Sequence, residues 1–225
     1  MRGLLTLLLM LAGLFGPQAL ARTHITAALQ AETLRPAAGS TFTIAFVMTP
    51  DPGWHGYWMN PGDAGKPLDP RWGLPSGVSV GPLRYPVPQT LIVSGLMNHV
   101  YEGRYAVLAE ARVPSNAAPG TRLPLRVHLE WLACTDAICV PEQAELALNL
   151  VVGAKTPAEP ENRAKFDTYR RALPRPLGGE ALFAADGAGG MRLSIPYPAA
   201  ASLEKPHFFS ADLGARSYAG QQNFT

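Results

Sequence analysis

The sequence predicts an all-β fold, and two observations support this prediction. Glycine and proline contribute 22 residues each, spread between short apolar segments instead of gathered in one tract, which indicates many turns. Several of these segments alternate apolar with polar residues, the period of a half-buried strand. Because the 19 basic and 17 acidic side chains nearly balance and form no basic run, nucleic acid is not an expected partner.

The clearest alternation runs from Leu123 to Trp131, where the odd positions are apolar and the even ones mostly polar. Residues 144–152 repeat the pattern, with Glu145 and Asn149 on the polar side. We expect these two runs to be antiparallel neighbours and the segment between them to be their connection.

Three further segments are strand candidates: residues 41–48, residues 105–113 and, with less regular alternation, residues 25–34. Short strands separated by turn residues at this spacing are typical of a β-sandwich of the immunoglobulin-like type. Residues 22–152 are therefore predicted to form one such domain.

The pattern changes after Val152. Residues 153–174 read as a linker followed by a short helix, because apolar side chains recur at helical spacing over residues 162–173 and Pro174 follows. Residues 175–225 are expected to form part of a second β-rich region, with strands over residues 191–195 and 207–211. No closing strand is evident after these, so we expect this region to be incomplete.

Residues 1–21 have the composition of a secretory signal peptide. Arg2 precedes an apolar run from Leu4 to Phe15, and residues 19–21 form an Ala-Leu-Ala cleavage site. The run is shorter than the roughly twenty residues that a spanning helix needs, although an uncleaved anchor is the alternative. The mature chain is thus expected to begin near Arg22, in an oxidising compartment where thiols form disulfides.

Cys134 and Cys139 are the only cysteines of the chain. A disulfide between them would close a short loop, worth about 2 kcal/mol in the chain-entropy model, against nearly 5 kcal/mol for a loop of roughly a hundred residues. Such a disulfide would add little to the stability of the fold. Two thiols on a strand connection are instead suited to dithiol–disulfide exchange. Asp136 between them is either a turn residue or a charge that raises the pKa of a neighbouring thiol.

Three segments together carry a resemblance to a known family: residues 53–63 (Gly-Trp-His-Gly-Tyr-Trp-Met-Asn-Pro-Gly-Asp), residues 95–103, and the cysteine segment followed by Pro141-Glu142. With the signal peptide and the β-rich domain, residues 24–152 resemble the amino-terminal periplasmic domain of the DsbD family of thiol:disulfide interchange proteins. The first segment is closer to the ScsB-like branch, which is linked to suppression of copper sensitivity.

The resemblance implies an immunoglobulin-like fold and a thiol:disulfide oxidoreductase of the protein-disulfide reductase type, located in the periplasm and working without a cofactor. It implies a membrane-embedded electron-donor domain, in the same or a separate chain, and periplasmic thioredoxin-fold proteins as acceptors. Copper tolerance and cytochrome c biogenesis are the associated processes. The chain would then be one part of a larger, membrane-anchored system.

The resemblance also assigns roles to residues. Cys139 would bond to the partner and Cys134 would resolve the mixed disulfide, although the residues alone leave this order open. His55 and Tyr57 fall where the family has polar aromatic residues beside the cysteines, as a wall of the site or as pKa-tuning groups; as structural residues they would simply pack or form hydrogen bonds. Residues 89–100 would be the cap loop, with Leu96, Met97 and Asn98, but without an aromatic shield.

Two other functions compete with this one. A copper-binding module would use soft ligands, and the chain has five His, six Met and two Cys, yet it contains no H-x-H, M-x-x-M or C-x-x-C motif. We therefore expect no metal site. A non-catalytic β-sandwich with a structural disulfide is the second alternative. Hydrolase, zinc-protease and nucleotide-binding motifs are absent from the sequence.

Overall fold

The computed structural model describes residues 22–155, 157, 160–176, 178–185, 187, 190–197, 206–213, 218 and 222–224. The predicted signal peptide, residues 1–21, lies outside the described residues. Within the described part of the chain, no helix is long and apolar enough to cross a membrane.

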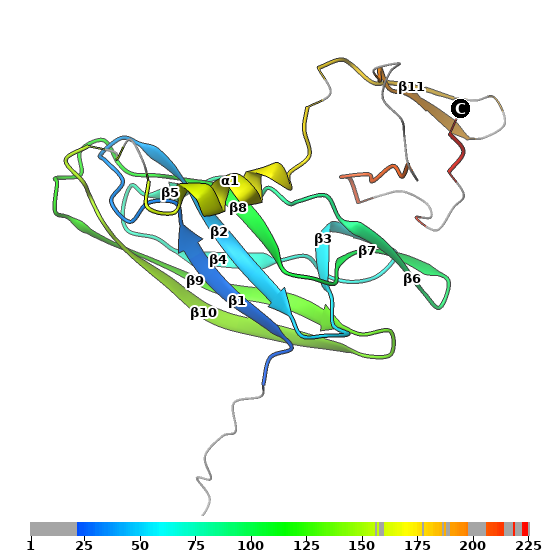
Figure 1. Cartoon of the computed structure of the whole chain (residues 1–225), viewed down its shortest axis with the longest axis horizontal. Helices are drawn as coiled ribbons and strands as arrows, with labels where there is room; N and C mark the ends of the chain where they lie inside the picture. The colour runs from blue at the N-terminus through cyan, green and yellow to red at the C-terminus, as the bar shows by residue number, and fades with distance from the viewer. Residues whose placement is uncertain are drawn as a thin grey trace, which may run out of the picture.

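Two antiparallel sheets form a sandwich (Figure 1). The first sheet has the strand order β1-β2-β8-β5, with β1 Ile25–Ala31, β2 Thr41–Pro50, β8 Tyr105–Arg112 and β5 Ser79–Val80. The second has the order β10-β9-β4, with β10 Cys139–Val151, β9 Arg122–Cys134 and β4 Asp69–Gly73. The immunoglobulin-like β-sandwich predicted from the sequence is confirmed.

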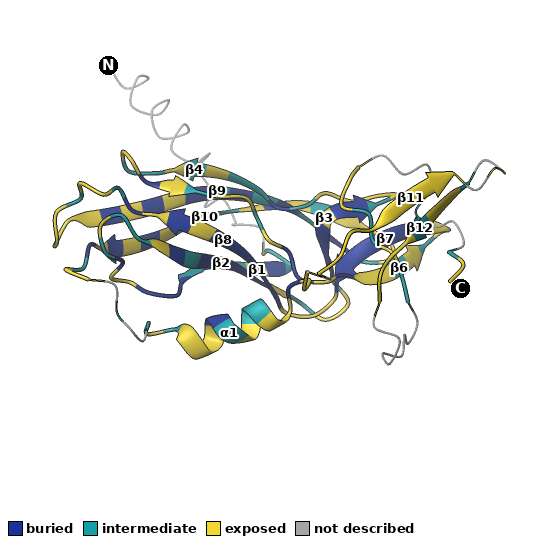
Figure 2. Cartoon of the chain, turned by 90° about the horizontal axis from the view of Figure 1, so that it is seen from above, coloured by how far each residue is buried: buried dark blue, intermediate teal, exposed yellow. Residues whose placement is uncertain are grey.

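The core lies between the two sheets, as the buried inner faces in Figure 2 show. Apolar side chains at alternate positions of β2, among them Ile44 and Phe46, pack in one cluster with Leu125 and Leu129 of β9. The long β9–β10 ladder runs in register from the Cys134–Cys139 pair to the Arg122–Val151 pair. The alternation in residues 123–131 therefore predicted both the strand and its inward face correctly.

A third sheet lies at one end of the sandwich (Figure 1) and has the order β3-β7-β6, with β3 Gly56–Gly62, β7 Leu96–Tyr101 and β6 Gln89–Val93. The segment expected as a cap loop, residues 89–100, is thus a β-hairpin. Ser94 and Gly95 both have positive φ, 51° and 82°, as the tightest hairpin turns require. Because this two-residue turn closes the segment, its flanks pair as strands instead of forming an open loop.

Helix α1, Arg163–Arg171, confirms the predicted helix and covers the outer face of the first sheet (Figure 1). Its Phe166 is fully buried among Ala45, Val47, Ala106 and Leu108. The Arg170 guanidinium forms an ion pair with Glu32, just after β1.

Beyond the helix, β11 Leu182–Ala185 pairs with β12 Met191–Ser194. The predicted strand over residues 191–195 is confirmed, and β11 was missed because its four residues show no alternation. The predicted strand at residues 207–211 is wrong. Its backbone carbonyls at Ser210 and nearby Asp212 accept hydrogen bonds from the Asn60 side chain at 2.8 and 2.9 Å, so the segment docks on β3 instead of joining a sheet.

Candidate redox site

The two cysteines face each other at the end of the β9–β10 ladder and form a disulfide, with 4.1 Å between their Cα atoms. Residues 135–138 make the turn that joins the strands. The Thr135 amide donates to the Ile138 carbonyl at 2.8 Å, and the Thr135 hydroxyl accepts from the amides of Ala137 and Ile138, both at 3.2 Å. The sequence left Asp136 either as a turn residue or as a charge beside a thiol, and the side-chain hydrogen bonds described here for the turn come from Thr135.

The disulfide lies on the face of the hairpin opposite to the sandwich core. The core-facing residues of β9 are the odd ones up to Ala133, so Cys134 points to the other face. Cys134 is nevertheless only 1% exposed, because the third sheet covers it with Tyr57, Val100 and Leu91. Cys139, at the same level on the outer strand, is exposed. One half of the disulfide is therefore shielded, and the other half faces solvent.

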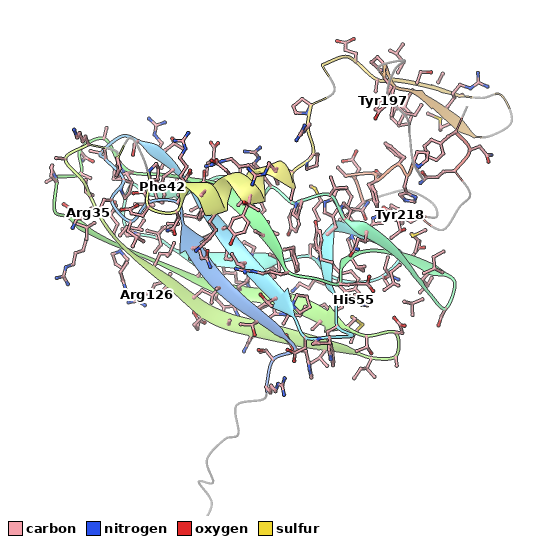
Figure 3. The ribbon with its side chains drawn as sticks, in the orientation of Figure 1. Arg35, Phe42, His55, Arg126, Tyr197 and Tyr218 are labelled. Carbon is pink, nitrogen blue, oxygen red and sulfur yellow. A yellow bond between two sulfur atoms is a disulfide. The ribbon has the colours of Figure 1, made fainter. Side chains whose placement is uncertain are left out.

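His55 fixes the position of Cys134 through the backbone. The His55 amide donates to the Cys134 carbonyl at 2.8 Å, and the Cys134 amide donates to the His55 carbonyl at 3.1 Å. The amide and carbonyl of Cys134 thus point away from Cys139, which makes the two cysteines a non-hydrogen-bonded pair, the closer of the two spacings in an antiparallel ladder. Directly opposed residues of an antiparallel pair project their side chains to the same face, so the His55 and Cys134 side chains share one face. Figure 3 labels His55 at this end of the sandwich.

The His55 and Tyr57 side chains, two residues apart, lie together on this face. The His55 Nε2 and the Tyr57 hydroxyl are 3.3 Å apart, and the rings meet edge to face. Burial lowers the pKa of His55, although the carboxylates of Asp136 and Glu102 act in the opposite direction. Burial also raises the pKa of Tyr57. An imidazole that is neutral at pH 7 offers no positive charge to a thiolate, but it can accept a proton.

The predicted cap residues differ in what they contact. Leu96 is exposed, whereas Met97 and Asn98 are buried. The Met97 amide donates to Asp63 Oδ2 at 2.8 Å, and the Asn98 side chain donates to the Leu96 carbonyl at 3.1 Å. These residues hold the hairpin in place, and it is Leu91 that packs in the Cys134 cluster.

Behind β3 and β7 lies a second buried group that the sequence interpretation missed. Asn60 and His99 are fully enclosed, and His99 Nδ1 lies 2.9 Å from the Asn60 carbonyl. The Phe209 ring meets the Trp58 and His99 rings in edge-to-face arrangements. The Asn60-Pro61-Gly62-Asp63 run was a possible signal, since such residues mark a backbone turn held by side-chain bonds. Among the described residues, no group of three or more His, Cys, Asp or Glu is arranged to hold a metal ion.

Comparison with known proteins identifies relatives of this chain. The model of the family described as "Thiol:disulfide interchange protein DsbD, N-terminal" matches residues 23–150, more than half of the chain. The fold is similar to the crystal structure of the N-terminal periplasmic domain of ScsB from Proteus mirabilis, with a TM-score of 0.53 and 19% identity, over 74% of this chain and 60% of that one.

A weaker similarity, with a TM-score of 0.33 and 9% identity, links 57% of this chain to 39% of the major pilin subunit BcpA of Bacillus cereus. No curated protein matches the sequence.

Proposed function

The chain belongs to the family of DsbD amino-terminal domains, and on this premise we propose that it is a periplasmic thiol–disulfide exchange module that acts through Cys134 and Cys139. It would receive electrons from a membrane-embedded donor and pass them to thioredoxin-fold partners. The observation that carries the proposal is the placement of the disulfide, at a hairpin end outside the sandwich core, with Cys139 exposed and Cys134 covered.

In the proposed forward reaction, the reduced domain meets a partner that carries a disulfide. The Cys139 thiolate attacks one partner sulfur, forms a mixed disulfide and releases the second partner sulfur as a thiolate. The Cys134 thiolate then attacks the Cys139 sulfur, which restores the internal disulfide and releases the first partner sulfur. Two electrons pass to the partner, and the two protons of the dithiol end on the partner's thiols.

The exposure of Cys139 supports its role as the attacking residue, since an attacking sulfur must reach the partner. Cys134 is then the resolving residue. The neutral His55 imidazole, on the same face as Cys134, would accept the Cys134 proton as this thiol becomes a nucleophile. Tyr57 and Leu91 keep water from the buried sulfur, and the β6–β7 hairpin would serve as the cap.

Trapping the mixed disulfide tests the proposal. Reduced Cys134→Ala and Cys139→Ala variants would each be mixed with a thioredoxin-fold oxidoreductase in its disulfide form, and products would be separated without reductant. We expect a covalent complex with Cys134→Ala and much less with Cys139→Ala, where the remaining thiol is buried. The reverse preference would contradict the assigned order.

The reduction potential of the wild-type pair separates exchange from a structural role. We expect a value between about −120 and −270 mV, the range of known exchange proteins. A value below about −300 mV, with no complex from either variant, would identify a structural disulfide and overturn the proposal.

A further inference from the structure

Glu142 is a buried carboxylate that the proposed reaction does not use. It lies on β10, three residues after Cys139, and faces the core side of the hairpin with 7% of its surface exposed. Its two oxygens accept three N–H groups: the amide of His24 at 2.5 Å, the amide of Ile25 at 3.1 Å, and the Trp131 indole Nε1 at 2.9 Å. A buried acidic group is costly to enclose unless it is bonded in this way.

These three donors come from segments that the sequence separates widely. Trp131 is directly opposite Glu142 on β9, so this bond ties the two strands of the redox hairpin together. Ile25 is the first residue of β1 in the other sheet and His24 directly precedes it, more than a hundred residues before Glu142. One carboxylate thus joins both strands of the hairpin to the start of the first sheet.

From His24 the connection continues to the redox site. The His24 ring stacks on Trp54, with centroids 3.6 Å apart and planes 5° from parallel. The His24 carbonyl accepts the Asp51 amide at 2.8 Å, and the Asp51 carbonyl accepts the Trp54 amide at 3.0 Å. The next residue is His55, whose backbone pairs with Cys134. The turn that delivers His55 to the disulfide is therefore anchored on Glu142.

We propose that Glu142 is a positioning residue for the exchange reaction, holding the hairpin and the His55 segment in place when the disulfide is open. The inference rests on the proposed function. Once the sulfurs separate, the hairpin end keeps Cys134 opposite Cys139 through the strand ladder, the His55 pairing and the Glu142 bonds. A high effective concentration of the two thiols favours the closed disulfide. Losing Glu142 lowers this concentration and makes the disulfide easier to reduce.

The test is the reduction equilibrium of the full mature chain in dithiothreitol buffers, read by alkylation of free thiols. For Glu142→Ala we expect the equilibrium to shift about tenfold toward the dithiol, which is about 30 mV less negative for a two-electron couple. Glu142→Gln keeps an acceptor oxygen, so its shift should have the same direction and a smaller size. Glu145→Gln, on the same strand but exposed and bonded to His128, removes the same charge and should leave the equilibrium unchanged.

A purely structural Glu142 would lower the free energy of unfolding and leave the equilibrium at the wild-type value, and that result would overturn the inference. If neither Glu142 variant folds, Trp131→Phe removes one donor and retains the aromatic ring. It should shift the equilibrium toward the dithiol, and a wild-type value would again overturn the inference. This equilibrium needs no protein partner, so a shift in the Glu142 variants supports the role of Glu142 even if mixed-disulfide trapping fails. Successful trapping with an unchanged equilibrium would instead support the exchange function and reject the role of Glu142.

Discussion

At the scale of single residues, the buried wall of the redox site depends on a glycine. Gly65 has φ of +109°, a conformation that side chains rarely adopt, and a Cβ placed there would lie 2.2 Å from the Tyr57 ring. Tyr57 in turn packs against Cys134. The absence of a side chain at Gly65 therefore leaves room for the Tyr57 ring beside Cys134.

We expect Gly65→Ala to lower the free energy of unfolding by about 1–3 kcal/mol, through overpacking against Tyr57 and backbone strain. Denaturant unfolding would measure the change. Gly103→Ala is the matched control, since no atom lies within 4 Å of its added Cβ. Equal stability of Gly65→Ala and wild type would show that Tyr57 moves aside freely.

The buried histidines predict a dependence of stability on pH. Burial lowers the pKa of both His55 and His99 in the folded state. Below the unfolded-state pKa of about 6.5, the unfolded chain binds protons that the folded chain does not, so stability falls as the pH falls. Each histidine contributes at most about 1.4 kcal/mol per pH unit. A hydrogen bond to Glu145 raises the pKa of the half-buried His128, so its contribution to stability has the opposite sign.

Unfolding measured between pH 7.5 and pH 5 should therefore show a loss of stability, and the loss should be smaller in His99→Gln. In His128→Gln the loss should be larger, because a group that opposes it is gone. A slope that His99→Gln leaves unchanged would contradict the assignment.

The sequence predicts the residues of this site unequally. Two isolated cysteines on a strand connection are visible without any structure. His55 and Tyr57 were placed by resemblance, since a histidine and a tyrosine in a strand carry no signal of their own. Thr135 and Glu142 could not be predicted, because their roles depend on hydrogen bonds to particular backbone groups, and for Glu142 these lie over a hundred residues away.

At the scale of elements, the β6–β7 hairpin presents one face to the disulfide and the other to solvent. Leu91 packs in the Cys134 cluster, whereas its neighbour Ile92 is 61% exposed. Alternation along β6 thus separates a shielding residue from a surface residue of similar size.

We expect Leu91→Ala to speed the reduction of the disulfide by dithiothreitol severalfold, because the shield over Cys134 is thinner. Ile92→Ala should leave the rate near that of wild type. Quenching the reaction at set times with an alkylating reagent and counting the alkylated thiols would give both rates. Equal rates for the two variants would mean that this hairpin does not act as a cap.

The elements that the sequence predicted well are the long strands with one face in the core and one in solvent. Strand β3 was not predicted because five of its seven residues are buried, Pro61 interrupts it, and its pairing with β7 shifts register between Tyr57 and Gly62. Without alternation, a buried strand gives no period to detect. The cap was expected as a loop from the family resemblance, and the Ser94-Gly95 turn, a weaker hairpin signal than Asn-Gly, did not reveal the hairpin.

At the scale of the whole molecule, helix α1 packs directly on the first sheet. The sequence interpretation ended this domain at residue 152 and assigned the helix to the linker. Phe166 is fully buried against the first sheet, and Asn162 donates to the Ala31 carbonyl at 2.9 Å. We therefore propose a boundary after Leu173, which is also buried in this cluster.

Phe166→Ala in the full chain should cost about 3–5 kcal/mol of unfolding free energy, the usual cost of removing a core phenylalanine. Phe183→Ala, at an exposed position on β11, should change it by less than about 0.5 kcal/mol. Thermal or denaturant unfolding measures both. A small effect at Phe166 would place the helix outside the cooperative unit.

The position of Cys134 on the outer face of the hairpin separates the redox site from the sandwich core. The same two strands carry the sandwich core on one side and the disulfide on the other. Opening the sulfur bridge removes no contact between the two large sheets. Reduction of the disulfide therefore leaves the packing between these two sheets intact, and substitutions in the β3-β7-β6 sheet can change the redox chemistry while the sandwich core keeps its contacts.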